Sequence, residues 1–164
     1  MKVLTAINSR LSRWAMYTAS TSLVGLLLFV IYGVVMRYVF NNAPPYVEQL
    51  ALLLVISVAM FGASSGVRDA GHIGLDSLVN LLSPKNQLKC KVIVYLLSIV
   101  FAISLFCGGI DMAVSTYNNT IPTLGFSEAI RYFPVITAGV LITLFSIEHV
   151  IALFQSKKVL PSWH

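Results

Sequence analysis

The chain has 164 residues, of which 57% are hydrophobic and 10% are charged, and its mean hydropathy is +0.85. A typical soluble domain has about 25% charged residues, which cover its apolar core. The composition therefore argues against a soluble enzyme, and the scarcity of Glu and Lys argues against a disordered tail or a soluble coiled coil.

Four stretches of the sequence are almost free of charge, and each is close to the roughly 20 apolar residues that a membrane-spanning helix needs. None alternates apolar and polar residues with period two, so an outer-membrane barrel is not favoured. The first is too long for a signal peptide, and we expect it to remain as an anchor. The sequence predicts one all-α integral membrane domain, residues 1–164, with transmembrane helices at about 14–36, 49–67, 92–110 and 132–154.

The positions of the basic residues predict the orientation of these helices. Of the 11 Lys and Arg residues, nine lie in the N-terminal segment, in the loop 68–91 and in the C-terminal tail. Only Arg37 and Arg131 lie in the other two loops. Because cytoplasmic loops are rich in Lys and Arg, we expect a multi-pass protein with both termini in the cytoplasm. The net charge of +5 is then a topology signal, and it does not require a nucleic-acid partner.

The first outward loop joins Arg37, at the end of one helix, to Glu48, in the first turn of the next. Each charge suits the helix dipole at its position, and a short loop brings the two close enough to pair. Tyr46 beside them is a typical interfacial aromatic residue. Two interpretations stay open: helix-end anchoring with an ion pair, or a docking surface for a partner at the outer face.

The second predicted helix contains Gly62 and Gly66 in a G-x-x-x-G pattern, and Ser104 and Gly108 repeat that spacing in the third. Small residues at this spacing allow close helix packing. The packing could occur within this chain or against a second protein, and the sequence leaves both open.

The cytoplasmic loop begins with Arg68 and is predicted to form a short amphipathic interfacial helix at about 73–83, because apolar residues recur there at helical spacing. His72 is a possible metal ligand, but Asp69 and Asp76 are the only other ligand types nearby. We therefore expect His72 to make an ordinary hydrogen bond, and we predict neither a metal nor a cofactor.

No ionisable residue lies near the middle of any predicted helix. Pumps and coupled transporters usually need buried ionisable groups or broken helices. Glu148 comes nearest, close to the cytoplasmic rim, and there it opposes the helix dipole, so we expect it to have a basic partner. The chain therefore reads as a non-enzymatic helical scaffold that belongs to a larger assembly.

Several short motifs follow one another along the chain: RYVFN at 37–41, YVEQL at 46–50, FGA at 61–63, GHIGLD at 71–76, PTLG at 122–125 and YFP at 132–134. In this order they resemble the DctQ-like family of small membrane subunits of tripartite ATP-independent periplasmic (TRAP) transporters. Two positions depart from the usual family pattern: Tyr46 replaces a common Trp, and Gln49 replaces a second acid.

The resemblance implies a subunit of a bacterial inner-membrane system that imports an organic acid with a sodium gradient. A periplasmic protein would deliver a dicarboxylate, another carboxylate or a sialic acid, and a large polytopic membrane subunit would transport it. This chain would form a heterodimer with the large subunit among the membrane lipids, as a non-catalytic scaffold and possible docking surface. The candidate structural or subunit-contact residues are Arg37, Tyr46, Glu48, Gly62, Gly66, Arg68, Gly71, His72 and Asp76.

Two other functions remain as alternatives. The chain could be a self-sufficient small transporter or channel that works as a homo-oligomer, although its helices offer little polarity for a pore. It could also be a membrane anchor for a soluble enzyme, with the loop 68–91 as the platform.

Overall fold

The computed structural model describes residues 2–69, 84–155 and 162. The predicted amphipathic segment 73–83 lies outside the described residues, as do Gly71, His72 and Asp76. The described part is all-helical, and four of its helices are long and apolar enough to cross a membrane. Its elements are α1 (Lys2–Tyr38), α2 (Pro45–Asp69), α4 (Pro84–Ser115), the short 3₁₀ helix η1 (Glu128–Tyr132) and α5 (Phe133–Phe154).

The four predicted helices are confirmed, but two of them extend well beyond their predicted bounds. Helix α1 begins at Lys2, although the prediction began at residue 14, and α4 begins at Pro84 and ends at Ser115. The prediction located only the apolar stretch. Helical hydrogen bonding continues through the more polar segments 2–13, 84–91 and 111–115. Within them, no proline follows the first residue of either helix.

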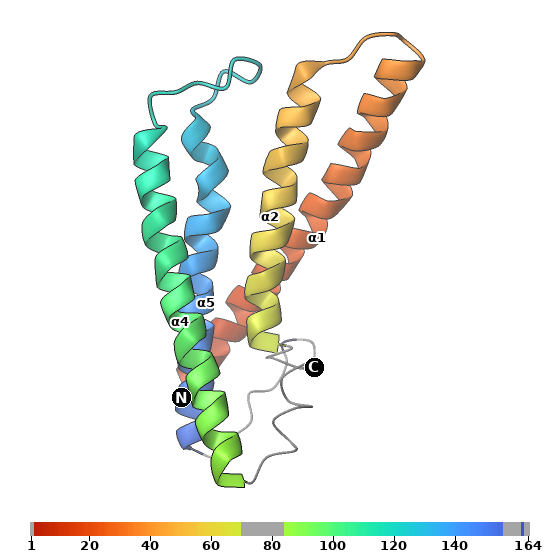
Figure 1. Ribbon diagram of the computed structural model, residues 1–164. Coiled ribbons are helices and arrows are strands. Elements are labelled where there is room, and N and C mark those ends of the chain that lie inside the picture. The colour runs from red at the N-terminus through yellow and green to blue at the C-terminus, as the bar shows by residue number, and fades with distance from the viewer. Residues whose placement is uncertain (1, 70–83, 156–161, 163–164) are drawn as a thin grey trace.

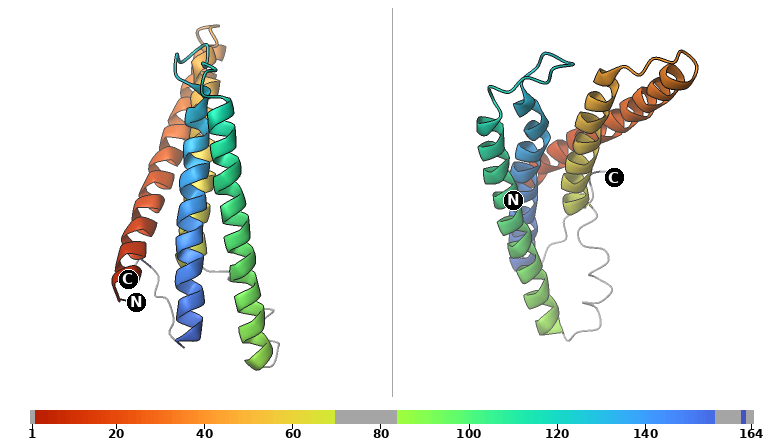
Figure 2. Two further views of the ribbon diagram at one scale, coloured as in Figure 1. Left: turned by 90° about the vertical axis from the view of Figure 1, so that its left-hand side faces the viewer. Right: turned by 45° about the horizontal axis from the view of Figure 1, so that its top comes forward.

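The helices form two antiparallel hairpins, α1 with α2 and α4 with α5, and α2 packs against α5 between them. In Figure 1 the hairpins diverge toward the end that carries the loops 39–44 and 116–127. Toward the opposite end the hairpins converge in Figure 1, and Asn8 of α1 contacts Leu144 and Glu148 of α5 there. We call these the loop end and the converging end of the bundle. Figure 2 shows the same helices from two further sides.

Large apolar side chains mostly point away from the bundle, as a lipid-facing surface requires. Leu28 on α1 and Leu97 on α4 are each 63% exposed. The interior instead uses small side chains around a core of Ala102, Ala138 and Ile142. In lipid, helices are held together by close packing and not by burial of large apolar residues. Large apolar side chains outside and small ones inside therefore agree with a membrane environment.

Helices α4 and α5 approach each other closely at Gly139 of α5. A Cβ added there would lie 2.8 Å from the carbonyl oxygen of Ala102 and 2.9 Å from the backbone nitrogen of Phe106. Only glycine therefore allows α4 and α5 to pack at this distance.

Candidate functional site

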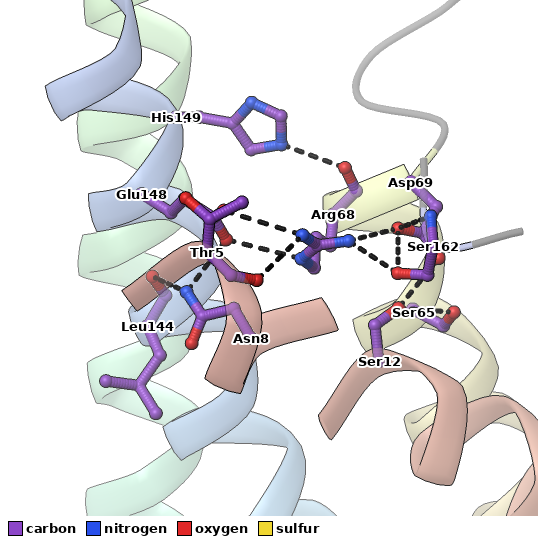
Figure 3. Close-up of polar contacts among 10 residues, drawn as sticks. All are labelled: Thr5, Asn8, Ser12, Ser65, Arg68, Asp69, Leu144, Glu148, His149 and Ser162. Atoms are coloured by element: carbon purple, nitrogen blue, oxygen red, sulfur yellow. Dashed lines mark hydrogen bonds and ion pairs between the residues drawn. The ribbon is translucent and has the colours of Figure 1, made fainter. Parts of the chain in front are cut away.

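The most distinctive polar feature is a buried cluster at the converging end of the bundle, centred on Arg68 (Figure 3). Arg68 ends the apolar part of α2 and extends its side chain toward α5, with only 2% of the residue exposed. Its Nε lies 3.2 Å from Glu148 Oε2, and its Nη1 lies 2.8 Å from Asp69 Oδ1. The guanidinium is therefore shared between two carboxylates, one on α5 and one on its own helix.

Glu148 is fully buried on α5 and needs further donors besides Arg68. Asn8 of α1 donates its Nδ2 to Glu148 Oε2 at 2.8 Å and also approaches the carbonyl oxygen of Leu144 at 3.4 Å. The Arg68 Nη2 also reaches the carbonyl oxygen of Thr5 at 3.5 Å. Three helices that are far apart in sequence thus meet through one charged group.

Asp69, the last residue of α2, accepts hydrogen bonds from two hydroxyl groups of the cluster. Ser12 of α1 donates to Asp69 Oδ2 at 2.8 Å, and its oxygen lies 3.0 Å from that of Ser65. Ser162 donates to Asp69 Oδ1 from both its hydroxyl, at 2.7 Å, and its backbone nitrogen, at 3.1 Å. The same hydroxyl accepts from Arg68 Nη1. Asp69 therefore ties the C-terminal tail to α1 and α2.

His149 caps the end of α2. Its Nε2 lies 3.0 Å from the carbonyl oxygen of Arg68, one of the carbonyl groups that lack an intrahelical partner at a helix end. Its ring stacks on Tyr95 of α4 with the centroids 4.8 Å apart. His149 therefore adds the fourth helix to the cluster.

These contacts suit a structural role and not a reaction. Arg68, Asp69 and Glu148 satisfy one another and point into the protein, where a substrate would have to break an ion pair to reach them. The described residues contain no group of three or more His, Cys, Asp or Glu side chains that could hold a metal ion. The sequence prediction of a basic partner for Glu148 is confirmed, and the partner is Arg68.

At the loop end, the structure brings together the predicted pair in the first loop. Arg37 Nη2 lies 2.8 Å from Glu48 Oε1, and the side chains are 54% and 69% exposed. Beside them the hydroxyl oxygens of Tyr32 and Tyr46 lie 3.0 Å apart. The pairing of Arg37 with Glu48 is therefore confirmed, and its exposure leaves it open to a partner.

A second contact at the loop end joins the two hairpins. Arg131 of η1 donates through Nη2 to Gln49 of α2, and its Nη1 lies 3.1 Å from Glu128 Oε1. Sequence reasoning missed Arg131 as a site residue, although Gln49 had been noted as a departure from the family pattern. An acid at position 49 would be an ion-pair partner for Arg131, so glutamine keeps the hydrogen bond and loses the charge.

The two glycines of the G-x-x-x-G pattern do not pack within the described part of the chain. A Cβ added at Gly62 or at Gly66 would meet nothing within 4 Å, and Gly108 is equally open. Close contacts occur at other glycines: Gly139, as above, Gly109, where a Cβ would lie 2.8 Å from a methylene group of Ile136, and Gly33, where it would lie 2.9 Å from a methyl group of Val47. Which of the two interpretations of the G-x-x-x-G pattern holds therefore stays open.

Several members of the cluster were not identified from the sequence, namely Asn8, Ser12, Ser65, Asp69 as a cluster member, His149 and Ser162. One signal was available. Asn8 and Ser12 are four residues apart and therefore lie on one face of the helix that runs into the first apolar stretch. The predicted helix began at residue 14, so Asn8 and Ser12 lay outside it and their shared helix face was not recognised.

Comparison with known proteins points to one family. Residues 26–156 match the family model described as the DctQ component of tripartite ATP-independent periplasmic transporters. Two proteins of Haemophilus influenzae named TRAP transporter small permease protein are similar to the chain. One is 28% identical over 131 residues, which are 80% of each chain. The other is 24% identical over 125 residues, 76% of this chain and 75% of the relative.

A third similar protein is much longer. The sialic acid TRAP transporter permease protein SiaT of Haemophilus influenzae is 32% identical over 111 residues, which are 68% of this chain but 17% of SiaT. The family match covers most of the chain, including the loop-end pair, η1 and Glu148. With this match and four helices able to span a membrane, the chain belongs to the DctQ family, the small permease components of TRAP transporters.

Proposed function

We propose that this chain is the non-catalytic scaffold subunit of a sodium-coupled uptake system for an organic acid. It holds a large polytopic transport subunit in the bacterial inner membrane, with both of its own termini in the cytoplasm. A periplasmic binding protein delivers the substrate at the loop end, which is the outer end in this orientation.

The observation that carries this proposal is the placement of charge. Within the described helices, the fully buried charged side chains are Arg68 and Glu148, and they pair with each other at one end of the bundle. The apolar stretches between that end and the loop end contain no Asp, Glu, Lys or Arg. A coupled transporter needs ionisable or unwound sites near the middle of the membrane, and those must then belong to another subunit.

The similarity to SiaT supports the same division of labour. A region similar to this chain makes up a small part of that longer permease protein. We infer that this chain works beside a separate large permease in the same way. The name of SiaT gives sialic acid as one substrate of such systems, and we extend the substrate class here to carboxylic acids in general, including dicarboxylates.

The open small-residue face of α2 is the surface that we assign to the large subunit. Gly62 and Gly66 have free space at their Cβ positions, and Ala59 and Ala63 beside them are exposed. Small residues let a second helix approach closely, which stabilises helix pairs in lipid. The exposed pair of Arg37 and Glu48 is the docking contact that we assign to the binding protein.

Co-purification with a large permease and flux measurements in proteoliposomes test this function. We expect the two proteins to purify together, and sodium-driven uptake to require both of them and the binding protein. Gly62→Ile should reduce co-purification severalfold, because the side chain fills the contact face. Leu28→Phe, at an exposed position of α1, is the matched control and should leave it unchanged.

Two results would count against the proposal. Sodium-driven flux from this chain alone would show a self-sufficient transporter. Purification with a soluble enzyme in place of a permease would show a membrane anchor.

A further inference from the structure

An apolar groove runs between α1 and α5 on the outside of the bundle. Its volume is about 340 Å³, and it is open along one side. The side chains that line it include Leu11, Trp14 and Thr18 of α1 and Phe133, Thr137 and Leu141 of α5.

The polar atoms of the groove wall are already used. Thr18 Oγ1 donates to the carbonyl oxygen of Trp14 at 2.9 Å, and Thr137 Oγ1 donates to that of Phe133, also at 2.9 Å. Both hydroxyl groups of these threonines therefore already donate to their own helices. The surface suits a hydrocarbon chain and offers no partner to a polar ligand.

A second groove of about 200 Å³ lies on the other side of α5, against α4, and is lined by Ile103, Phe106 and Thr143 among others. Thr143 likewise donates its hydroxyl to a backbone carbonyl, that of Gly139, at 2.8 Å. Val140 lines both grooves. A molecule with two hydrocarbon chains can therefore straddle α5 at this residue.

A cation lies one helical turn before Trp14, which lines the first groove. Arg10 is exposed, is next to Leu11, and precedes Trp14 by four residues, so Arg10 and Trp14 lie one above the other on the helix. Helical side chains lean toward the N-terminus, which carries the guanidinium beyond the end of the groove. Trp14 is 70% exposed, as a tryptophan at the headgroup level of a membrane would be.

We propose that this groove binds an anionic phospholipid, with an acyl chain along α1 and α5 and the phosphate at Arg10. Basic sites between transmembrane helices bind anionic headgroups, and a single basic residue near the surface adds about a fivefold preference. This site is independent of the proposed transport function.

Arg13 provides a matched control for Arg10. It is three residues further along the same helix and is also exposed, but it is turned by about 100° from Trp14, away from the other residues of α1 that line the groove. General electrostatic attraction to a negatively charged membrane would depend on both arginines alike. A site in the groove depends on Arg10 alone.

Trp14 itself reports on the lipid beside it. The full chain carrying Trp163→Phe, with Trp14 as its single tryptophan, is reconstituted into vesicles of dioleoyl phosphatidylcholine. Quenching of the Trp14 fluorescence is then compared for brominated phosphatidylglycerol and brominated phosphatidylcholine. We expect about a fivefold preference for the anionic lipid, its loss in Arg10→Gln and its retention in Arg13→Gln.

A second variant tests the acyl chain separately. Thr18→Phe fills the groove and should abolish the preference with Arg10 intact, whereas Leu28→Phe, exposed on the same helix, should keep it. Equal quenching by both lipids, equal effects of Arg10→Gln and Arg13→Gln, or release of the anionic lipid by inorganic phosphate at unchanged ionic strength would each overturn the proposal.

Discussion

Replacing Arg68 by methionine is the most direct test of the buried cluster. The substitution keeps much of the apolar stem and removes the charge that pairs with Glu148 at 3.2 Å. Both side chains are fully buried, and among the contacts described above Glu148 would keep the hydrogen bond from Asn8. Leaving a buried charge without its partner lowers the free energy of unfolding by about 3–5 kcal/mol. That is a large part of the total, which is about 5–15 kcal/mol for a typical protein.

The double variant distinguishes a lost ion pair from a lost side chain. In Arg68→Met with Glu148→Met, neither charge of the pair remains, so the double variant should be more stable than Arg68→Met alone by about 1–3 kcal/mol. Asp69 still accepts hydrogen bonds from Ser12 and Ser162 in both variants.

The assay is unfolding in mixed micelles of dodecyl maltoside and sodium dodecyl sulfate, followed by circular dichroism. Arg37→Ala is the matched control, because it breaks an ion pair that is more than half exposed and worth at most about 1 kcal/mol. If Arg68→Met costs no more than Arg37→Ala, or if the double variant is less stable than Arg68→Met, the cluster does not hold the bundle together.

Three further predictions concern the loop end and the glycines. Gln49→Glu should raise the free energy of unfolding by about 0.5–1 kcal/mol through its contact with Arg131, and the gain should vanish in the Arg131→Gln background. Arg37→Ala should change that free energy little but reduce co-purification or the affinity of the binding protein, and unchanged assembly and uptake would refute the docking role. Gly139→Ala should cost about 1–3 kcal/mol in the isolated chain, because its Cβ would overlap a facing backbone. Gly62→Ala, with open space at its Cβ, should stabilise the isolated chain by about 0.5–1 kcal/mol. If Gly139→Ala melts at a higher temperature than Gly62→Ala, the packing described here is wrong.

The sequence predicted the helices well because apolar length is read directly along the chain. Membrane helices must satisfy their own backbone groups, so residues 49–67 and 92–110 had no other regular structure available. The ends were harder. Helix α1 continues to Lys2 through a polar segment, and hydropathy does not distinguish a polar helix from a polar tail.

Partners within the bundle were only partly predictable. A cationic partner for Glu148 was predictable, because an acid at the C-terminal end of a helix is unfavourable. Which cation it would be was not predictable, because the N-terminal segment, the loop 68–91 and the C-terminal tail are all basic. Which glycines pack was not predictable, since Gly62, Gly66 and Gly139 look alike in sequence. Only the relative rotation of the helices shows that Gly139 faces α4 and that the other two face outward.

The separation of Arg68 and Glu148 along the chain has a consequence for biogenesis. The two residues are 80 positions apart, so a ribosome that adds about 5–20 residues per second makes Glu148 about 4–16 s after Arg68. During that interval Arg68 can already pair with the neighbouring carboxylate of Asp69, which lies on the same helix. Arg68 lies in the last turn of α2, and its pair with Glu148 can form only after α5 has been made.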